Sequence, residues 1–168
     1  MPTTFTHFPS PLGELVLTAS ETGLAGVYFP TSAHIRGEAW VEDDGQGPAA
    51  KILARTREQL AAYFACTRTK FDLPLEPTGT PFELRVWEEL RAIPFGAMRS
   101  YSEIARRLGD ARLTRAVGAA NGKNPIPIIV PCHRVVGANG DLTGFGGGLD
   151  RKRWLLEHEG ALLMLGRA

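Results

Sequence analysis

The segment from Asn124 to Val136 constrains the fold of this chain more than any other stretch. It reads Asn-Pro-Ile-Pro-Ile-Ile-Val-Pro-Cys-His-Arg-Val-Val. The apolar residues 128–130 are expected to form a short buried strand that ends at Pro131, because proline cannot extend a ladder of hydrogen bonds. Cys132 then lies at the rim of a packed element, where a reactive group can be aimed at a ligand. A sulfur nucleophile is the first candidate chemistry.

Cys132 has two readings on local sequence. A lone cysteine is commonly a small buried hydrophobe. As a nucleophile it needs help, because a thiol with a pKa near 8.5 is only a few per cent thiolate at neutral pH, and full ionisation raises the reactive fraction by at most roughly 30-fold. His133 could accept the proton, but neighbouring residues on a strand point to opposite faces. The two side chains can act together only if the chain turns at Cys132 or a water bridges them, and Pro131 favours a turn.

Composition removes several classes of protein. The 168 residues can hold one or two small domains with a real core. The first five residues show neither a basic patch nor an apolar stretch, so no secretory signal is expected, and the longest apolar runs are too short to cross a bilayer. Cys66 and Cys132 are too few for a disulfide scaffold, and a cytoplasmic location is expected. Cysteine and histidine do not pair at ligand spacing, so neither a metal nor another cofactor is expected.

The net charge of +1 hides an asymmetry. Residues 1–79 carry 6 Lys and Arg against 9 Asp and Glu, whereas residues 80–168 carry 13 against 9. The resulting charges of −3 and +4 favour a polyanionic partner for the second half. An unevenly charged, solvated surface explains the charge equally well.

The first half is expected to be a small α/β domain. Two strand-like segments with a turn between them predict a hairpin, a helically spaced apolar pattern predicts a helix, and an alternating segment predicts another strand; these are residues 15–19, 24–29, 49–65 and 71–75. The polar residues 31–49 are expected to be a loop. Residues 76–79, Glu-Pro-Thr-Gly, mark a boundary between domains 1–76 and 80–168.

The second half is expected to be mostly helical. Capping boxes begin at Thr80, with Pro81 at the first helical position, and at Ser100. A third helix follows Leu113, and a final helix covers residues 150–159. Two short helices joined by a short turn suit a helix-turn-helix. Together with the N-terminal hairpin, they give an expected fold class of α/β (α+β), with an antiparallel N-terminal sheet and a mostly helical, winged-helix-like C-terminal domain.

Further residues suggest chemistry beside simpler alternatives. A carboxylate at Glu159, in the last turn of the final helix, opposes the helix dipole and suggests a partner, for which His133 is one candidate; a solvated side chain is the alternative. Small residues on the helix after Leu113 permit close approach to a surface but read few base edges. Arg115 is the one long cation there, and could be an ordinary surface arginine. Residues 144–148 could wrap a flat ligand with Phe145 stacked on it, or form a flexible turn.

Taken together, four stretches resemble the methylated-DNA–protein-cysteine methyltransferases, also called O6-alkylguanine-DNA alkyltransferases: residues 131–136, Asn124-Pro125, residues 115–118 and residues 154–160. The likeness is close over residues 80–160 and holds in outline for the N-terminal half. It implies a monomeric repair protein that binds double-stranded DNA and moves an alkyl group irreversibly from the O6 atom of guanine to its own cysteine. O4-alkylthymine is a further candidate substrate.

The resemblance also implies roles for individual residues. Cys132 would accept the alkyl group, His133 would act as the base through a water, and Glu159 would orient His133. Asn124 would tie the active-site turn to the helix-turn-helix, and Tyr101 would give a proton to the leaving guanine. The implied contacts with DNA and guanine come from Arg115, which fills the gap of the flipped nucleotide, and from Thr114, Ala116, Gly118, Val135, Phe145 and Gly146.

Two positions depart from the family pattern: Phe145 lacks the hydroxyl of the tyrosine often found there, and Leu113 stands where small residues are frequent. The chemistry agrees with the resemblance independently, since dealkylation of a saturated carbon needs a soft in-line nucleophile. The O6 atom lies within the base stack, so flipping is required at a cost of a few kcal/mol. A binding module that senses lesions without chemistry and a cysteine hydrolase remain alternative functions.

Overall fold

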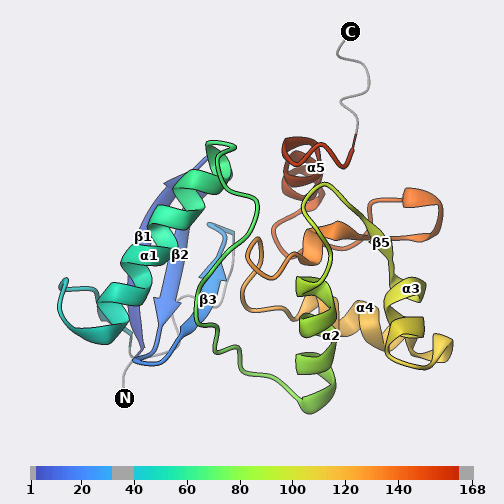
Figure 1. The fold of residues 1–168 in the computed structure, drawn as a ribbon, viewed down its shortest axis with the longest axis horizontal. Helices are drawn as coiled ribbons and strands as arrows, with labels where there is room; N and C mark the ends of the chain where they lie inside the picture. Colours follow the sequence, from blue (N-terminus) through green and yellow to red (C-terminus); the bar gives the residue numbers. More distant parts are fainter. Residues whose placement is uncertain (1–2, 32–39, 163–168) are drawn as a thin grey trace, which may run out of the picture. The chain divides into compact units, whose positions relative to one another are not determined.

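The computed structural model describes residues 3–31 and 40–162. The chain divides into two compact units, Met1–Thr78 and Gly79–Ala168 (Figure 1). The predicted fold class is confirmed, because the first unit is a mainly antiparallel sheet with one helix and the second is mostly helical. Across both described stretches, every helix is too short or too polar to cross a membrane.

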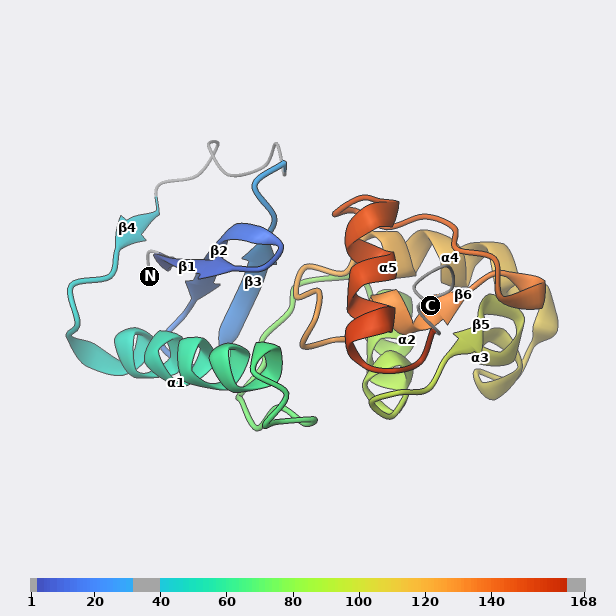
Figure 2. The same ribbon diagram turned by 90° about the horizontal axis from the view of Figure 1, so that it is seen from above.

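The first unit is a four-stranded sheet with a helix on one face (Figure 2). The sheet order is β3-β2-β1-β4; β2 pairs antiparallel with β1 and β3, and β4 pairs parallel with β1. Its elements are β1 (Thr4–Ser10), β2 (Gly13–Ala19), β3 (Leu24–Tyr28), β4 (Val41–Glu42) and α1 (Gly47–Phe64).

Alternation along the strands places one set of side chains against α1. Leu15 and Leu17 are fully buried, as are Leu53 and Leu60 of the helix. Phe8 stacks on Phe64 of α1 with ring centroids 6.3 Å apart. Apolar side chains of the hairpin and of α1 therefore lie in one core.

Two sequence predictions in this unit were partly wrong. Residues 71–75 do not form a strand; Leu75 makes only an isolated bridge with Leu24, since Pro74 beside it has no N–H to continue a ladder. The predicted loop 31–49 contains the short strand β4 and the first turn of α1, and its residues 32–39 lie outside the described part of the chain.

The second unit packs short helices around a two-stranded parallel sheet, in which β5 pairs with β6. Its elements are α2 (Pro81–Arg91), β5 (Arg99–Ser100), α3 (Tyr101–Arg107), η2 (Ala111–Leu113), α4 (Thr114–Gly122), η3 (Cys132–Arg134), β6 (Val135–Val136), η4 (Ala138–Gly140) and α5 (Leu149–His158), where η is a 3-10 turn. The predicted pair of short helices is present as α3 and α4.

Local signals fix where the helices begin. The Thr80 hydroxyl accepts from the Glu83 amide at 3.1 Å, and the Glu83 carboxylate accepts from the Thr80 amide at 2.9 Å. Ser100 and Glu103 make the same reciprocal pair at the start of α3. Both predicted capping boxes are confirmed.

Trp87 connects α2 to α4. Its indole N–H donates to the carbonyl oxygen of Ala120 at 2.8 Å, and its side chain is almost fully buried. Val117 of α4 is also fully buried. One side of α4 is therefore anchored in the core, and the opposite side of the helix is exposed.

We expect Thr80→Ala to lower the free energy of unfolding of the second unit by about 1 kcal/mol, because an N-terminal amide of α2 loses its acceptor. Chemical denaturation followed by circular dichroism measures the change. Thr78→Ala, at an exposed position two residues earlier, is the matched control and should leave the midpoint within error. Equal effects of the two substitutions would contradict the capping role.

Candidate active site

The side chain of Asn124 organises the turn that precedes Cys132. Its oxygen accepts from the Ile126 amide at 3.0 Å, and its amide nitrogen donates to the Val130 carbonyl at 2.8 Å. The Val130 amide donates back to the Ile126 carbonyl at 2.9 Å. Residues 124–130 thus form a closed turn, in which the Asn124 side chain takes the place of backbone hydrogen-bond partners.

The predicted strand at residues 128–130 is wrong, although all three residues are buried. Ile128 has a φ of 74°, in the left-handed region, where a β-branched residue is strained. Prolines at 125, 127 and 131 remove three amide donors from this stretch, so a ladder was not available to it. The apolar run predicts a strand wrongly here, because a buried turn and a buried strand can have the same run of apolar residues.

Pro131 then reverses the chain in a tight turn. Its φ of −81° and ψ of 66°, with the Cys132 amide donating to the Val130 carbonyl at 2.8 Å, define an inverse γ-turn. Cys132 opens the 3-10 turn η3 directly afterwards. The expected turn at Cys132 is confirmed, and Cys132 and His133 do not alternate across a strand.

His133, Arg134 and Glu159 form a buried cluster. Nε2 of His133 lies 2.8 Å from Oε2 of Glu159, and the Arg134 guanidinium contacts both carboxylate oxygens at 2.7 and 2.9 Å. Arg134 also donates to the Ile93 carbonyl at 2.7 Å. The expected contact between Glu159 and His133 is present, and Arg134 balances the carboxylate charge.

The cluster determines the protonation of the imidazole. Burial tends to raise the pKa of Glu159, but hydrogen bonds from His133 and Arg134 outweigh it and hold that pKa well below the ordinary range. Burial lowers the pKa of His133 despite the opposing effect of Glu159, so the ring is neutral at neutral pH. Because a carboxylate only accepts, Nε2 must carry the hydrogen. Nδ1 therefore presents a lone pair, and it is buried without a hydrogen-bond partner among the described residues.

Cys132 is a buried residue, with 5% of its surface exposed. Burial raises its pKa to about 11, and a hydrogen bond from Asn124 and the charge of Lys152 offset only part of that rise. The thiol is consequently protonated at neutral pH in this state. A nearby proton acceptor is needed before the sulfur can act as a nucleophile.

Lys152 is a site residue that sequence reasoning missed. It is fully buried in α5, and its ammonium donates to the carbonyls of Thr143 and Gly144 at 2.7 and 3.3 Å. Burial lowers its pKa to about 8. A signal existed, since Lys152 shares a helix face with Leu155, Leu156 and Glu159 at spacings of three, four and seven.

Tyr101, at the start of α3, is joined to the same loop. Its hydroxyl donates to the Thr143 carbonyl at 3.2 Å, and the Thr143 hydroxyl lies 3.3 Å from the Tyr101 oxygen. The Lys152 ammonium lies 5.9 Å from the centre of the Tyr101 ring. The ring is also near α4, because a Cβ built on Gly118 would lie 3.9 Å from it. Tyr101, Lys152 and loop 143–144 are thus held together.

The remaining predicted site residues lie on α4 and beyond η3. Arg115 and Ala116 are exposed on α4, while Thr114 and Gly118 are half-buried there. Val135 is buried in β6, Phe145 is half-buried and Gly146 is exposed. No group of three or more His, Cys, Asp or Glu in residues 3–31 and 40–162 is placed to hold a metal ion.

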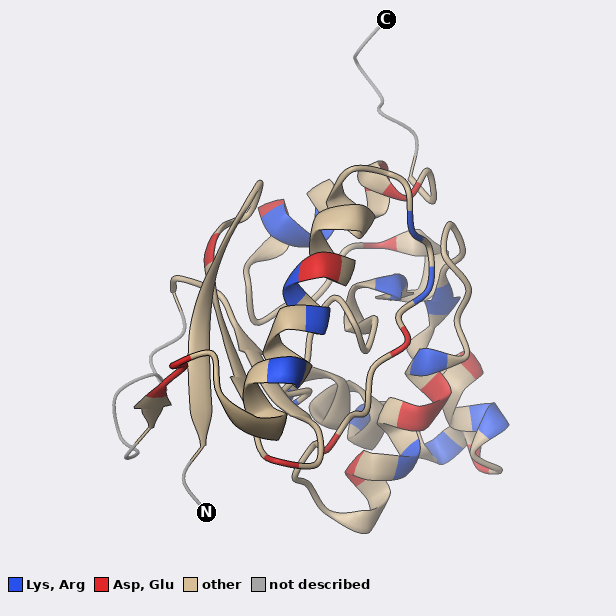
Figure 3. Ribbon diagram, turned by 60° about the vertical axis from the view of Figure 1, so that its left-hand side comes forward, with Lys and Arg blue, Asp and Glu red and all other residues tan. Residues whose placement is uncertain are grey.

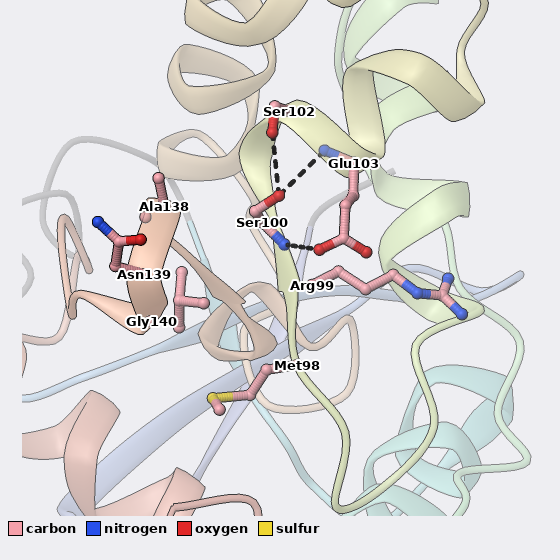
Figure 4. Close-up of a pocket in the computed structure, with 10 residues that line it drawn as sticks. Met98, Arg99, Ser100, Ser102, Glu103, Ala138, Asn139 and Gly140 are labelled. Atoms are coloured by element: carbon pink, nitrogen blue, oxygen red, sulfur yellow. Dashed lines mark hydrogen bonds between the residues drawn. The ribbon is translucent and has the colours of Figure 1, made fainter.

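A separate cavity of about 330 Å³ lies between the start of α3 and η4 (Figure 4). Figure 4 shows Ser100 and Glu103 of the capping box on one side and Ala138 and Asn139 on the other. Cys132 and His133 do not line it. This cavity is therefore distinct from the cysteine turn.

We expect Glu159→Gln to lower the free energy of unfolding by about 3–5 kcal/mol at pH 7, because the Arg134 charge would remain buried and unpaired. Glu88→Gln, which removes an exposed ion pair to Arg91, is the control and should change it by less than about 1 kcal/mol. Denaturant titrations at several pH values measure both.

The pH dependence has a defined sign. Because the folded-state pKa of Glu159 lies below its ordinary value of 4.5, its contribution is complete above that pH and is lost as the pH falls toward the folded-state pKa. The difference between the original chain and Glu159→Gln should therefore narrow below pH 4.5. A difference that is constant down to acid pH would contradict the paired carboxylate.

Comparison with known proteins identifies relatives of both units. Residues 81–161 match the family described as "6-O-methylguanine DNA methyltransferase, DNA binding domain", and residues 4–77 match "6-O-methylguanine DNA methyltransferase, ribonuclease-like domain". The methylated-DNA–protein-cysteine methyltransferase of Methanosarcina acetivorans is 44% identical over 161 residues, covering 92% of this chain and 96% of that protein. The Mycobacterium tuberculosis protein of the same name is 47% identical over 156 residues, covering 89% and 88%.

Solved structures agree with these relatives. The crystal structure of Mycobacterium tuberculosis OGT in complex with DNA is similar with a TM-score of 0.84 and 43% identity, covering 96% of this chain and 94% of that one. An O6-methylguanine DNA methyltransferase from Methanococcus jannaschii gives a TM-score of 0.64 at 25% identity, covering 95% of each chain. Matches of this extent, over a chain that also carries the buried Cys132-His133 turn and its Glu159 partner, establish that it belongs to the 6-O-methylguanine DNA methyltransferase family.

Proposed function

We propose that this protein repairs double-stranded DNA by moving the alkyl group of O6-alkylguanine to the sulfur of Cys132, once per molecule. The observation that carries the proposal is the Cys132-His133 turn, in which Glu159 fixes the imidazole with its Nδ1 lone pair available as a base. The relatives named as methylated-DNA–protein-cysteine methyltransferases support the substrate class.

The proposed reaction begins with removal of the thiol proton. His133 accepts it through a water, and the resulting imidazolium is stabilised by the Glu159 carboxylate 2.8 Å away. The sulfur electron pair then forms the S–C bond while the C–O6 bond breaks and leaves its pair on guanine. The products are an S-alkylcysteine and guanine.

Guanine leaves more readily when its ring is protonated, and Tyr101 is the proposed donor. The Lys152 cation is near the Tyr101 ring and favours both the phenolate that forms and the attacking thiolate. Phe145, Gly146 and Val135 are the proposed contacts of the flipped base. Asn124 supports the sulfur directly, because its amide hydrogen-bonds to Cys132 as well as closing the turn.

DNA binding is proposed for residues 80–168, with domain 1–76 in a structural role. Small residues on α4, at Thr114, Ala116 and Gly118, would permit close approach to the minor groove, and Arg115 would fill the space left by the flipped nucleotide. Figure 3 shows that basic positions are spread over the helices of this unit with acidic ones among them, as in the Arg107–Glu89 pair. Such a surface offsets part of the flipping cost through phosphate contacts that do not read sequence. Mycobacterium tuberculosis OGT, a similar structure, was solved in complex with DNA.

The thioether product is chemically stable, and one transfer per molecule follows. A monomer suffices, since the proposed site lies in one chain. A free thiol as nucleophile is suited to a reducing cytosol, which is the proposed location.

We expect incubation with duplex DNA containing O6-methylguanine to add one methyl group to the Cys132 peptide, measured by mass spectrometry. The peptide of Cys66, an exposed cysteine, is the internal control and should remain unmodified. Cys132→Ala should abolish transfer while retaining DNA binding. Methyl loss from DNA with an unmodified Cys132 peptide, or many turnovers per molecule, would contradict the proposal and favour a hydrolase.

We expect Arg115→Ala to slow repair of duplex DNA by on the order of 10- to 100-fold, because it removes the residue that replaces the flipped nucleotide. Reaction with the free base O6-benzylguanine, which needs no flipping, should change little. Arg112→Ala is the matched control, since Arg112 is exposed nearby and already paired with Asp110. Equal slowing of Arg115→Ala on duplex and free base would contradict the flipping role.

A further inference from the structure

Two buried polar atoms near Cys132 have no hydrogen-bond partner among the described residues: Nδ1 of His133 and Oδ1 of Asn121. Buried polar atoms in folded proteins are nearly always satisfied, by protein groups or by ordered water. Leaving either one unpaired would cost free energy. The pair therefore requires an explanation.

The Asn121 side chain lies against the peptide group that joins Cys132 to His133. Asn121 is in the last turn of α4 and is 4% exposed, and its amide nitrogen donates to the Cys132 carbonyl at 3.4 Å. This contact fixes which end of the amide is the oxygen. Oδ1 of Asn121 therefore belongs to an amide that is hydrogen-bonded to this peptide unit, and Nδ1 of His133 belongs to the residue that follows the same peptide unit in the chain.

Both unpaired atoms are acceptors. Asn121 Oδ1 is an amide oxygen, and Nδ1 of His133 has the lone pair because Nε2 donates to Glu159. A water molecule has two hydrogens to donate and two lone pairs. One water can therefore donate to both acceptors and still accept from the thiol of Cys132.

We propose that Asn121 is a positioning residue for alkyl transfer: its Oδ1, Nδ1 of His133 and Sγ of Cys132 together bind the water that carries the thiol proton. This inference rests on the proposed function. The thiol proton passes to the water as a proton of that water passes to Nδ1, so the water is regenerated. The sulfur keeps the electron pair that forms the S–C bond.

A purely structural role explains Asn121 less well. Its one protein hydrogen bond is long, at 3.4 Å, and a leucine of similar volume would fill the position without burying an unpaired oxygen. The water site gives the oxygen a partner. Because Asn121 is part of α4, the site also links the position of the relay water to the helix that we propose contacts DNA.

The test compares Asn121→Leu with Asn121→Ala in single-turnover transfer from saturating O6-methylguanine duplex between pH 6.5 and 9.5. Leucine excludes water, so the rate near pH 7.5 should fall roughly tenfold or more, with a steep rise at higher pH as hydroxide replaces the relay. Alanine leaves room for a second water and should keep more of the rate than leucine. Val117→Ala, a buried change on the same helix, should lower stability but leave the pH profile unchanged.

A structural role predicts the opposite order, because the alanine variant has the larger cavity and should be the less stable. Asn121→Leu with the rate and pH profile of the original chain, or rates that follow stability alone, would overturn the inference. An original chain that transfers no methyl group would instead refute the proposed function.

Crystallography of the unsubstituted chain provides a second test that does not depend on a variant folding. One ordered water within hydrogen-bonding distance of Asn121 Oδ1, His133 Nδ1 and Cys132 Sγ supports the relay. Separate waters on Asn121 and His133, or none, would overturn it.

Discussion

The rest of the candidate site depends on the hydrogen bonds that the Glu159 carboxylate accepts. The carboxylate is fully buried, yet it accepts from His133 and from both ends of the Arg134 fork, so its charge is matched inside the protein. The same oxygen that pairs with His133 selects the ring tautomer and leaves Nδ1 as an acceptor. Structure and chemistry therefore share one interaction: the arrangement that keeps a buried charge tolerable also supplies the base.

The backbone before Cys132 is a second constraint, and it stores strain. Ile128 occupies the left-handed region at a cost of about 1–2 kcal/mol. The Asn124 side chain and burial of the neighbouring apolar residues hold it there. The result is a rigid turn that presents the sulfur at a fixed point, which an extended strand would not do.

Local features of this fold were predictable from sequence, and long-range ones were not. The capping boxes at Thr80 and Ser100 were found because every atom involved lies within four residues. The turn at Ile128 was missed because it depends on a side-chain substitute for backbone bonds and on a φ that isoleucine rarely adopts. The strand predicted at residues 71–75 failed at Pro74, a signal that was present in the sequence.

Within the site, Cys132, His133 and Glu159 could be proposed from their motif, but their partners could not. Arg134 reaches Glu159 across 25 positions, and the unpaired oxygen of Asn121 is visible only once neighbouring groups are in place. Lys152 could be predicted from the sequence, because a lysine on an apolar helix face indicates a buried charge.

The burial of Cys132 has a consequence for a protein that is used once. Peroxide attacks exposed thiolates, whereas a covered thiol that holds its proton oxidises slowly. Idle molecules would keep the acceptor sulfur of Cys132 intact until they meet damaged DNA, and the exposed Cys66 would meet oxidants first. For a protein that is used once, the time for which its acceptor thiol stays unoxidised sets how many molecules remain able to react.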